Sequence, residues 1–300
     1  MKKSIQDMRL THRCLRLCVI TLLLVGGCTT APPESVAKFR QGLALVNTDS
    51  QRILLEFNSF VRDLQLDRAE KLKNLKESDL TPGLDAESVS RWNAAMEAMS
   101  LYASALATLA APEGSTEVEE SLKSLGARIV TLGPPKDAAS SQEDELTQAV
   151  SHIGELIVGA AARRKALEVA READPSVRAV LLQMANMIGS DQVTAGLRTT
   201  IWSNWTMRAN EIRAEFLEPG ANKRQVAAMY AMAIEGRQTS DVALSALRRA
   251  LLDLADLHTA VAQGRSADAS DIILSIHKEI VYAKQLLESA RASESEGGVQ

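Results

Sequence analysis

The sequence predicts an all-α fold, an elongated antiparallel bundle of long helices. Apolar residues recur at steps of three and four along most of the chain, which is the period of helices packed on one another. Hydrophobic residues make up 46% of the chain and aromatic residues only 3%, so the apolar side chains are mainly Ala, Leu, Val, Ile and Met. Strand signals are nearly absent, because the sequence has no sustained period-two alternation and no Asn-Gly or Asp-Gly turn.

The first predicted helix runs over residues 34–76 and ends before Thr81-Pro82-Gly83. Its apolar positions keep coiled-coil spacing for more than four heptads, with one polar member: Val36, Phe39, Leu43, Val46, Ser50, Ile53, Phe57, Phe60 and Leu64. Such a stripe packs either inside its own bundle or on a partner. The chain has ample apolar helix to cover it internally, so we favour a monomer.

Two shorter helices follow in the N-terminal segment. Asp85 is the expected N-cap of the second helix, which Pro112 and Gly114 close. Thr116 and Glu119 have the spacing of a capping box and begin a third helix that extends to residue 132. Residues 133–141 then form a polar linker, which leaves open a division into two subdomains, residues 34–132 and 142–292.

The C-terminal segment is predicted to be helical between clear breaks. A helix over 142–172 stops before Asp174-Pro175, which caps and begins the next helix, and Gly189-Ser190-Asp191 ends that one. A helix over 192–217 stops at Pro219-Gly220. From residue 223 the pattern continues, with an interruption at Gly236 and a recap at Ser240 or Asp241, to Gly264 as C-cap. The last helix covers 267–292, and residues 293–300 are predicted to be a disordered tail.

Residues 1–27 have the pattern of an export signal. Five basic residues precede a run of about a dozen apolar residues, which is too short to span a bilayer as a helix. A start at Met8 would leave a more compact leader, so the initiation site stays open between Met1 and Met8. Cys14 and Cys18 lie inside this segment, so we expect them to be discarded with it and to hold no metal.

The leader ends in Val25-Gly26-Gly27-Cys28, which resembles the lipobox of bacterial lipoprotein precursors. The resemblance implies cleavage before Cys28 and acylation of that cysteine, which would anchor the chain to a membrane. Thr29 stands where an aspartate would retain such a protein in the inner membrane, so the resemblance implies the periplasmic face of the outer membrane. Residues 28–33 are then a short tether. Without the lipobox, the same leader would release a soluble periplasmic or secreted protein.

The mature chain is acidic. Removing residues 1–27 reduces the 34 basic and 38 acidic residues to 29 and 37, a net charge of about −8. An acidic surface repels phosphate backbones, so we expect no nucleic-acid partner.

Candidate reactive groups are few, and we expect no catalytic, metal or cofactor site. The sequence contains no HExxH, GxSxG, phosphate-binding loop or GxGxxG pattern. Asp253, Asp256 and His258 are close in sequence, but positions two apart point to different sides of a helix, so we expect a solvated face there rather than a metal site. Trp202 and Trp205 lie three apart on one helix and form a candidate partner or ligand patch, or else mark the core and its edge.

These observations predict a non-catalytic, lipid-anchored envelope protein that acts as a helical scaffold or adaptor for another envelope protein. The main alternative is a carrier that binds a small apolar ligand or a lipid between helices. An enzyme of unfamiliar type is a third class.

Overall fold

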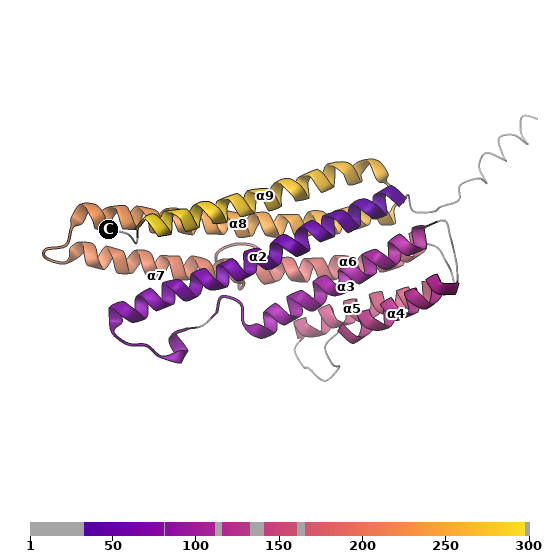
Figure 1. Cartoon of the computed structure of the whole chain (residues 1–300), viewed down its shortest axis with the longest axis horizontal. Helices are drawn as coiled ribbons and strands as arrows, with labels where there is room; N and C mark the ends of the chain where they lie inside the picture. The colour runs from indigo at the N-terminus through magenta and orange to yellow at the C-terminus, as the bar shows by residue number, and fades with distance from the viewer. Residues whose placement is uncertain (1–32, 81, 112–115, 133–140, 161–165, 298–300) are drawn as a thin grey trace, which may run out of the picture. The chain divides into compact units, whose positions relative to one another are not determined.

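A computed structural model of the chain describes residues 33–80, 82–111, 116–132, 141–160 and 166–297 (Figure 1). Their regular secondary structure is entirely helical, with no β-strand among the described residues. The elements are α2 (Pro33–Leu72), the 3₁₀-helix η1 (Glu77–Asp79), α3 (Ala86–Ala110), α4 (Thr116–Leu132), α5 (Ser141–Ala160), α6 (Ala166–Ile188), α7 (Leu197–Leu217), α8 (Lys223–Ala262) and α9 (Ser266–Gly297).

The helices pack around one hydrophobic core that includes residues from every α-helix. The long helix α8 contacts α9, α6, α7 and α2, and α2 also contacts α9, α3 and α7. At the other side of the core, α4 and α5 pack on each other, and both contact α3 (Figure 1). Residues far apart in sequence therefore meet in the interior, which supports the helical-bundle fold that the sequence predicts.

The heptad stripe of the first helix is buried within the chain, as predicted. Its apolar members up to Phe57 are at most 1% exposed, and Ser50 is fully buried. The Ser50 hydroxyl donates to the Asn47 carbonyl at 3.2 Å, so the one polar member of the stripe satisfies itself on its own helix. Farther along, Phe60 and Leu64 are only partly buried against the core.

The predicted helix boundary at Asp174-Pro175 is wrong, because α6 begins at Ala166 and passes through both residues. Proline lacks the N–H that would bond to the Arg171 carbonyl, which costs about 3 kcal/mol inside a helix. The continuous stripe of Ala170, Ala173, Val177 and Val180 is fully buried on both sides of the proline and offsets that cost. The Asp174 carboxylate bonds to α8 instead of capping its own helix.

The predicted interruption at Gly236 is also wrong, since α8 is continuous from Lys223 to Ala262. A Cβ on Gly236 would lie 2.4 Å from the ring of Trp205, so glycine makes room for the indole there. Ser240 accepts a hydrogen bond from Trp205 Nε1 at 3.1 Å and does not cap a helix. Helix packing thus explains why α6 and α8 continue through Pro175 and Gly236.

Several helix ends differ from the prediction. The first helix stops at Leu72, where Lys73 has a positive φ of 52°, and α7 begins at Leu197 rather than Gln192. Helix α8 ends at Ala262 with Gln263 as its C-cap, one residue before the predicted Gly264, which follows with a φ of 70°. The last helix, α9, continues to Gly297 and so includes residues 293–297 of the predicted tail.

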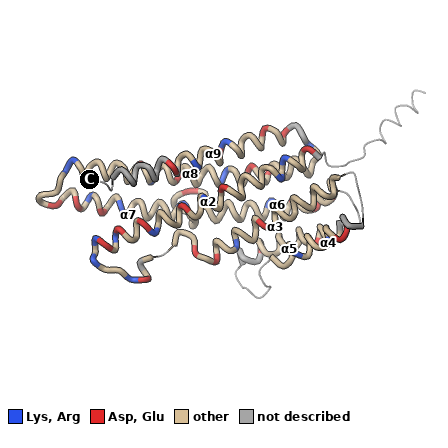
Figure 2. Tube along the Cα trace, in the orientation of Figure 1, with Lys and Arg blue, Asp and Glu red and all other residues tan. Residues whose placement is uncertain are grey.

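Charged residues are interspersed along the helices and follow one another closely in the chain at the C-terminal end of α2 and just after it (Figure 2). None of the described helices is long and apolar enough to cross a membrane. Residues 133–140 lie outside the described ranges, so the proposed linker and the division into two subdomains stay predictions, as does everything that the sequence predicts for residues 1–32.

Candidate functional site

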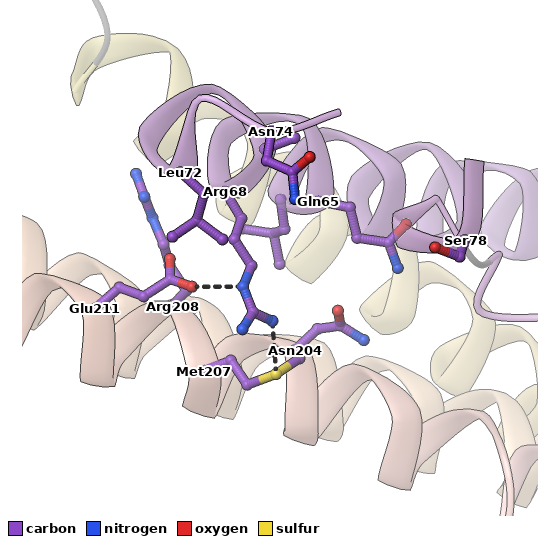
Figure 3. A pocket seen from close by; sticks show the side chains of 11 residues that line it. Gln65, Arg68, Leu72, Asn74, Ser78, Asn204, Met207, Arg208 and Glu211 are labelled. Carbon is purple, nitrogen blue, oxygen red and sulfur yellow. Dashed lines mark hydrogen bonds and ion pairs between the residues drawn. The ribbon is translucent and has the colours of Figure 1, made fainter. Parts of the chain in front are cut away.

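A cavity of about 340 Å³ lies between the C-terminal third of α2, the segment that follows it, and α7 (Figure 3). Its lining combines two guanidinium groups, three carboxamides, a hydroxyl and a carboxylate with a few apolar side chains: Arg68, Arg208, Gln65, Asn74, Asn204, Ser78, Glu211, Leu64, Ala69, Leu72 and Met207. A volume of this size is within the range of small-molecule sites. The mixture of groups suits a polar ligand better than an oily one.

Arg68 occupies the middle of this cavity. Figure 3 shows its side chain reaching from α2 toward α7, between Glu211 and Asn204. Its Nε lies 3.2 Å from Glu211 Oε1, and its Nη1 donates to the thioether sulfur of Met207 at 3.3 Å. Asn204 Nδ2 donates to the Thr200 carbonyl at 2.8 Å, so its Oδ1 is the atom that can accept from a ligand.

The lining of the cavity contains few of the side chains that usually act as acids, bases or nucleophiles in enzymes. Its lining residues include neither histidine nor cysteine, and the one carboxylate, Glu211, is already paired with Arg68. General acid–base catalysis needs a group that can give or take a proton near neutral pH. The lining therefore offers hydrogen-bond donors and acceptors to a bound ligand.

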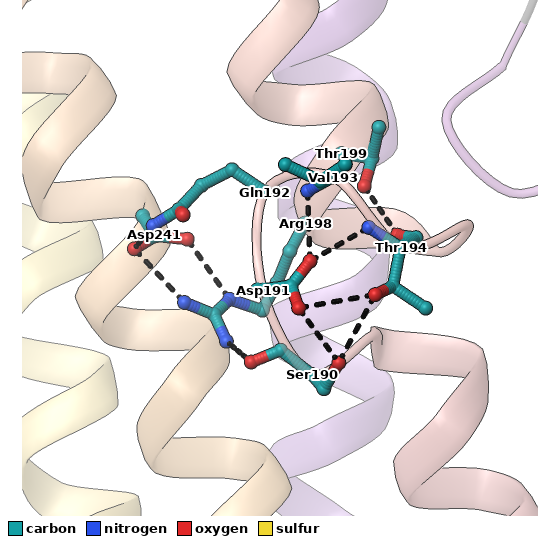
Figure 4. Close-up of polar contacts among 8 residues, drawn as sticks. All are labelled: Ser190, Asp191, Gln192, Val193, Thr194, Arg198, Thr199 and Asp241. Atoms are coloured by element: carbon teal, nitrogen blue, oxygen red, sulfur yellow. Dashed lines mark hydrogen bonds and ion pairs between the residues drawn. The ribbon is translucent and has the colours of Figure 1, made fainter.

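A second polar site is the loop between α6 and α7, residues 189–196 (Figure 4). Asp191 accepts hydrogen bonds from the backbone N–H groups of Thr194 and Val193, at 2.6 and 2.8 Å, and from the hydroxyls of Thr194 and Ser190. These bonds, led by the one from Thr194 N–H, lower the pKa of Asp191 to about 2. The carboxylate stays ionised and holds the loop in one shape, with Val193 88% exposed at its surface.

The base of this loop is fastened by a largely buried ion pair between α7 and α8. Arg198 donates from Nε and Nη2 to the two oxygens of Asp241, at 2.8 and 3.0 Å, and from Nη1 to the Ser190 carbonyl. Gln192 adds a 2.7 Å bond to Asp241, so among the described residues this carboxylate is bonded from the loop and from the first turn of α7. Bidentate pairing fixes both distance and orientation.

A third site is a hydrogen-bonded chain in the core, formed by Tyr102 of α3, His258 of α8 and Asp174 of α6. His258 Nδ1 lies 2.8 Å from Asp174 Oδ1, and His258 Nε2 lies 2.8 Å from the Tyr102 hydroxyl. Phe39 packs edge-on against the imidazole, with ring centroids 5.0 Å apart. Both Tyr102 and His258 are fully buried.

Burial and hydrogen bonding set the protonation states of Tyr102, His258 and Asp174. Desolvation lowers the pKa of His258, although Asp174 opposes the effect, so the ring is neutral at pH 7. Burial would raise the pKa of Asp174, but hydrogen bonds from His258 and Thr259 outweigh it, and the pKa is lowered. The ionised carboxylate only accepts, so Nδ1–H donates to Asp174 and Nε2 accepts the Tyr102 proton. Desolvation raises the pKa of Tyr102 well above its ordinary value.

The two tryptophans of the predicted patch have different surroundings. Trp205 is buried, stacks obliquely on Phe60 at 4.5 Å between centroids, and donates to Ser240. Trp202 is half-buried beneath the guanidinium of Arg237, which lies 4.5 Å from the ring centroid. Trp205 is thus part of the core, and contact of either residue with a partner or ligand stays a prediction.

Asp253, Asp256 and His258, which are close in sequence, have different partners in the structure. Asp256 pairs with Arg178 at 2.9 Å, whereas His258 pairs with Asp174. The expectation that His258 lies on a solvated face is wrong, because it is in the core. Among the described residues, no three His, Cys, Asp or Glu side chains converge as metal ligands would. Cys28, the predicted acylation site, lies outside the described residues.

The residues that sequence reasoning missed are those that meet only through tertiary packing. The cavity joins residues 64–78 to residues 204–211, and the core chain joins Tyr102, Asp174 and His258. The one available signal was Asp174, a polar residue beside a proline in an otherwise helical stretch. No family model, curated protein or solved structure matches this chain.

Proposed function

We propose that this chain is a non-catalytic, lipid-anchored envelope protein that acts as a helical scaffold or adaptor for another envelope protein. The observation that carries the proposal is the start of α2, the first of the described helices. Helix α2 starts at Pro33, only five positions after Cys28, the residue in the lipobox-like motif. At about 3.3 Å per residue, the tether of residues 28–33 reaches at most about 20 Å. An acylated Cys28 would hold the helices against the membrane surface, and Thr29 favours the periplasmic face of the outer membrane.

The buried Tyr102–His258–Asp174 chain supports a structural role over a catalytic one. It has the order of a catalytic relay, with a hydroxyl, an imidazole and a carboxylate. The Tyr102 hydroxyl is fully buried and already bonded to His258, so it meets no substrate. In this position the chain ties α3, α6 and α8 to one another.

An outward face of α9 supports contact with a protein partner. Leu274 and Val281 lie seven positions apart, and Tyr282 follows, so the three share one side of the helix. Their exposed fractions are 55%, 36% and 45%, high for large apolar side chains. Such a face fits an amphipathic helix of another envelope protein. Within the same proposal, the helices form an elongated antiparallel bundle, with a boundary near residues 133–141.

The alternative of a carrier for a small apolar ligand has less support. An apolar recess between α3 and α5 is lined by Ala94, Ala95, Leu146 and Val150, among others. Its volume is about 170 Å³, below the range of about 300–1,000 Å³ for ligand sites. It suits a packing groove better than a lipid pocket.

Replacing Cys28 with serine tests the anchor. We expect the variant to leave the membrane fraction and to lose labelling by radioactive palmitate, because the thioether and the new N-terminus that carry acyl chains no longer form. The control is Cys18→Ser, inside the leader, which should be labelled and localised as the wild type is. Unchanged membrane association and label in Cys28→Ser would disprove the anchor.

The adaptor role is tested by site-specific photo-crosslinking in intact cells. A photoreactive residue at Tyr282 should give a discrete adduct with one envelope protein, and one at Arg224, exposed on α8, should not. Adducts of equal yield at both positions, or none at Tyr282, would contradict the assignment of this face.

A further inference from the structure

We infer that the cavity between α2 and α7 binds a small organic anion, a carboxylate or a phosphate monoester, through the free end of the Arg68 guanidinium. This site is separate from the adaptor surface on α9 and does not depend on the proposed function. The argument rests on which hydrogen-bonding groups of the lining are already engaged and which are not.

The outer edge of the Arg68 guanidinium is the group available to a ligand. Its Nε is engaged by Glu211, and its Nη1 meets only the Met207 sulfur, which is a weak acceptor. Its Nη2 has no partner among the described residues. The Nη1–Nη2 edge can therefore donate two parallel hydrogen bonds to an oxyanion, the geometry in which arginine binds carboxylate and phosphate most strongly.

A second guanidinium lines the same cavity with an unused donor. Arg208 Nη2 is 3.4 Å from Asp67 Oδ2, and its Nη1 is buried without a hydrogen-bond partner among the described residues. The lining itself holds two cations and one carboxylate, although the chain has a formal net charge of −4. Because Asp67, which does not line the cavity, already pairs with Arg208, we expect modest affinity, in about the millimolar to micromolar range.

The remaining lining groups restrict the rest of the ligand. Because Asn204 already donates to Thr200, its free Oδ1 favours a ligand that carries a hydroxyl or an N–H near the oxyanion. Leu64, Ala69 and Leu72 provide an apolar side for a short aliphatic part. A hydroxy acid or a sugar-alcohol phosphate has these three features, whereas a long acyl chain does not fit the volume.

The experiment measures binding of 3-hydroxybutyrate and of glycerol 3-phosphate to the purified full chain in detergent micelles, by titration calorimetry and equilibrium dialysis. The neutral amide of 3-hydroxybutyrate has the same shape without the charge and should not bind. We expect saturable 1:1 binding of at least one of the two anions. The better of the two identifies the oxyanion as carboxylate or phosphate.

Matched variants assign the binding to this cavity. Arg68→Gln should weaken it at least about tenfold, because a charge-assisted pair of hydrogen bonds is worth at least about 1.4 kcal/mol, a factor of ten. Arg62→Gln, an exposed arginine earlier on α2 that bonds to Ser59, should bind as the wild type does. Glu211→Gln should bind more tightly, because it removes the competing carboxylate from Arg68.

Two results would overturn the inference. One is no binding of either anion at about 10 mM, ten times the weakest Kd expected. The other is equal affinity in the wild type, Arg68→Gln and Glu211→Gln. Should Arg68→Gln fail to fold, Glu211→Gln still decides, since tighter binding supports the site and unchanged or weaker binding refutes it.

Discussion

At the residue scale, the molecule depends on polar side chains that are buried and paired across helices. The partners of His258 lie 84 and 156 positions away in sequence, at Asp174 and Tyr102. A single sequence does not reveal such pairs, since nothing local distinguishes a histidine in the core from one on a wet face. Asp85 shows the contrast, because its N-cap bond to Ser88, only three residues away, is predicted correctly.

Replacing Tyr102 with phenylalanine should destabilise the fold by about 1–3 kcal/mol. The change leaves His258 Nε2 as a buried acceptor without a donor, and that is the usual cost of an unsatisfied buried group. Urea unfolding measures the effect. Tyr230→Phe, at a partly exposed position on α8, is the control and should change stability little. Equal effects of the two substitutions would show that the core bond contributes nothing.

Acidification should destabilise the protein through His258. Its pKa is lowered in the folded state, so the unfolded chain binds a proton more readily. The contribution of His258 to the free energy of unfolding is full above about pH 6.5, the ordinary pKa of histidine. It is lost as the pH falls through the lower pKa of the folded state. The groups that face this ring are Tyr102 from α3 and Asp174 and Arg178 from α6.

The free energy of unfolding, measured at pH 7.5 and pH 5.5 for the wild type and for His258→Gln, isolates this contribution. The decrease on acidification should be smaller in the variant. Asp253 acts in the opposite direction, because burial raises its pKa and its contribution is lost as pH rises through that raised value. Since Asp253 titrates in both proteins, the comparison cancels it, and an identical decrease in both would exclude His258 as the source.

At the element scale, the sequence predicts that each helix exists, but it does not predict several of the helix boundaries. The heptad pattern identifies the buried stripe of α2 because the period of the sequence and the period of the helix coincide. The sequence predicts breaks at Pro175 and Gly236 because both residues disfavour helices locally. Tertiary packing decides otherwise in each case, through Asp174 bonded to α8 and Trp205 packed on Gly236.

Two helix ends of the same type should respond oppositely to substitution. Lys73 and Gly264 each follow the end of a helix, and each has a positive φ. The N–H of the next residue donates to a carbonyl five positions back, from Asn74 to Ala69 and from Arg265 to Ala260. Lys73→Gly should stabilise the protein by about 1 kcal/mol, since glycine tolerates this conformation. Gly264→Ala should destabilise it by about the same amount. Urea midpoints that shift in the same direction for both would contradict this assignment.

The crossing of α4 and α5 should not tolerate a methyl group. A Cβ on Gly126 would lie 2.8 Å from the Gly154 carbonyl oxygen and 3.0 Å from the Val158 nitrogen, and backbone atoms cannot move aside cheaply. Gly126→Ala should cost about 1–3 kcal/mol.

The control for this crossing is Gly42→Ala in α2, where the nearest atom is the end of the Leu257 side chain at 3.2 Å. The higher helix propensity of alanine, about 1 kcal/mol, offsets the small shift that the Leu257 side chain must make, so we expect stability close to wild type. A Gly126→Ala variant as stable as Gly42→Ala in thermal unfolding would show that the two helices do not approach as closely as the structure has them.

At the scale of the whole molecule, the fold class follows from composition and period, whereas the cavity does not. Its residues come from α2, the segment that follows α2, and α7, and the sequence does not indicate that α2 and α7 are neighbours. The stripe of α2, which could have served a partner, is buried against the chain's own helices. The choice between an internal and an external role for that stripe required the structure.

The chain should therefore be a monomer when its lipid is absent. Sedimentation equilibrium of the Cys28→Ser variant, with the leader removed, should give the mass of one chain at micromolar concentration. The opposite result would be the mass of two chains, falling to that of one chain when Val36 or Phe39 is changed to a polar residue with the helical content preserved. It would show that the α2 stripe contacts a second copy of the chain.

The loop at residues 189–196 leaves and re-enters the fold at nearly the same point. An added Cβ on Gly196 would lie 2.9 Å from the Gly189 Cα, so the backbone closes behind the exposed Val193. The spacing of α6 and α7 is therefore set at this neck and not by the length of the loop, and each doubling of that length costs only about 0.6 kcal/mol in closure entropy. An epitope tag inserted beside Val193 would therefore extend away from the helices, at the cost of the bonds from the Val193 and Thr194 N–H groups to Asp191.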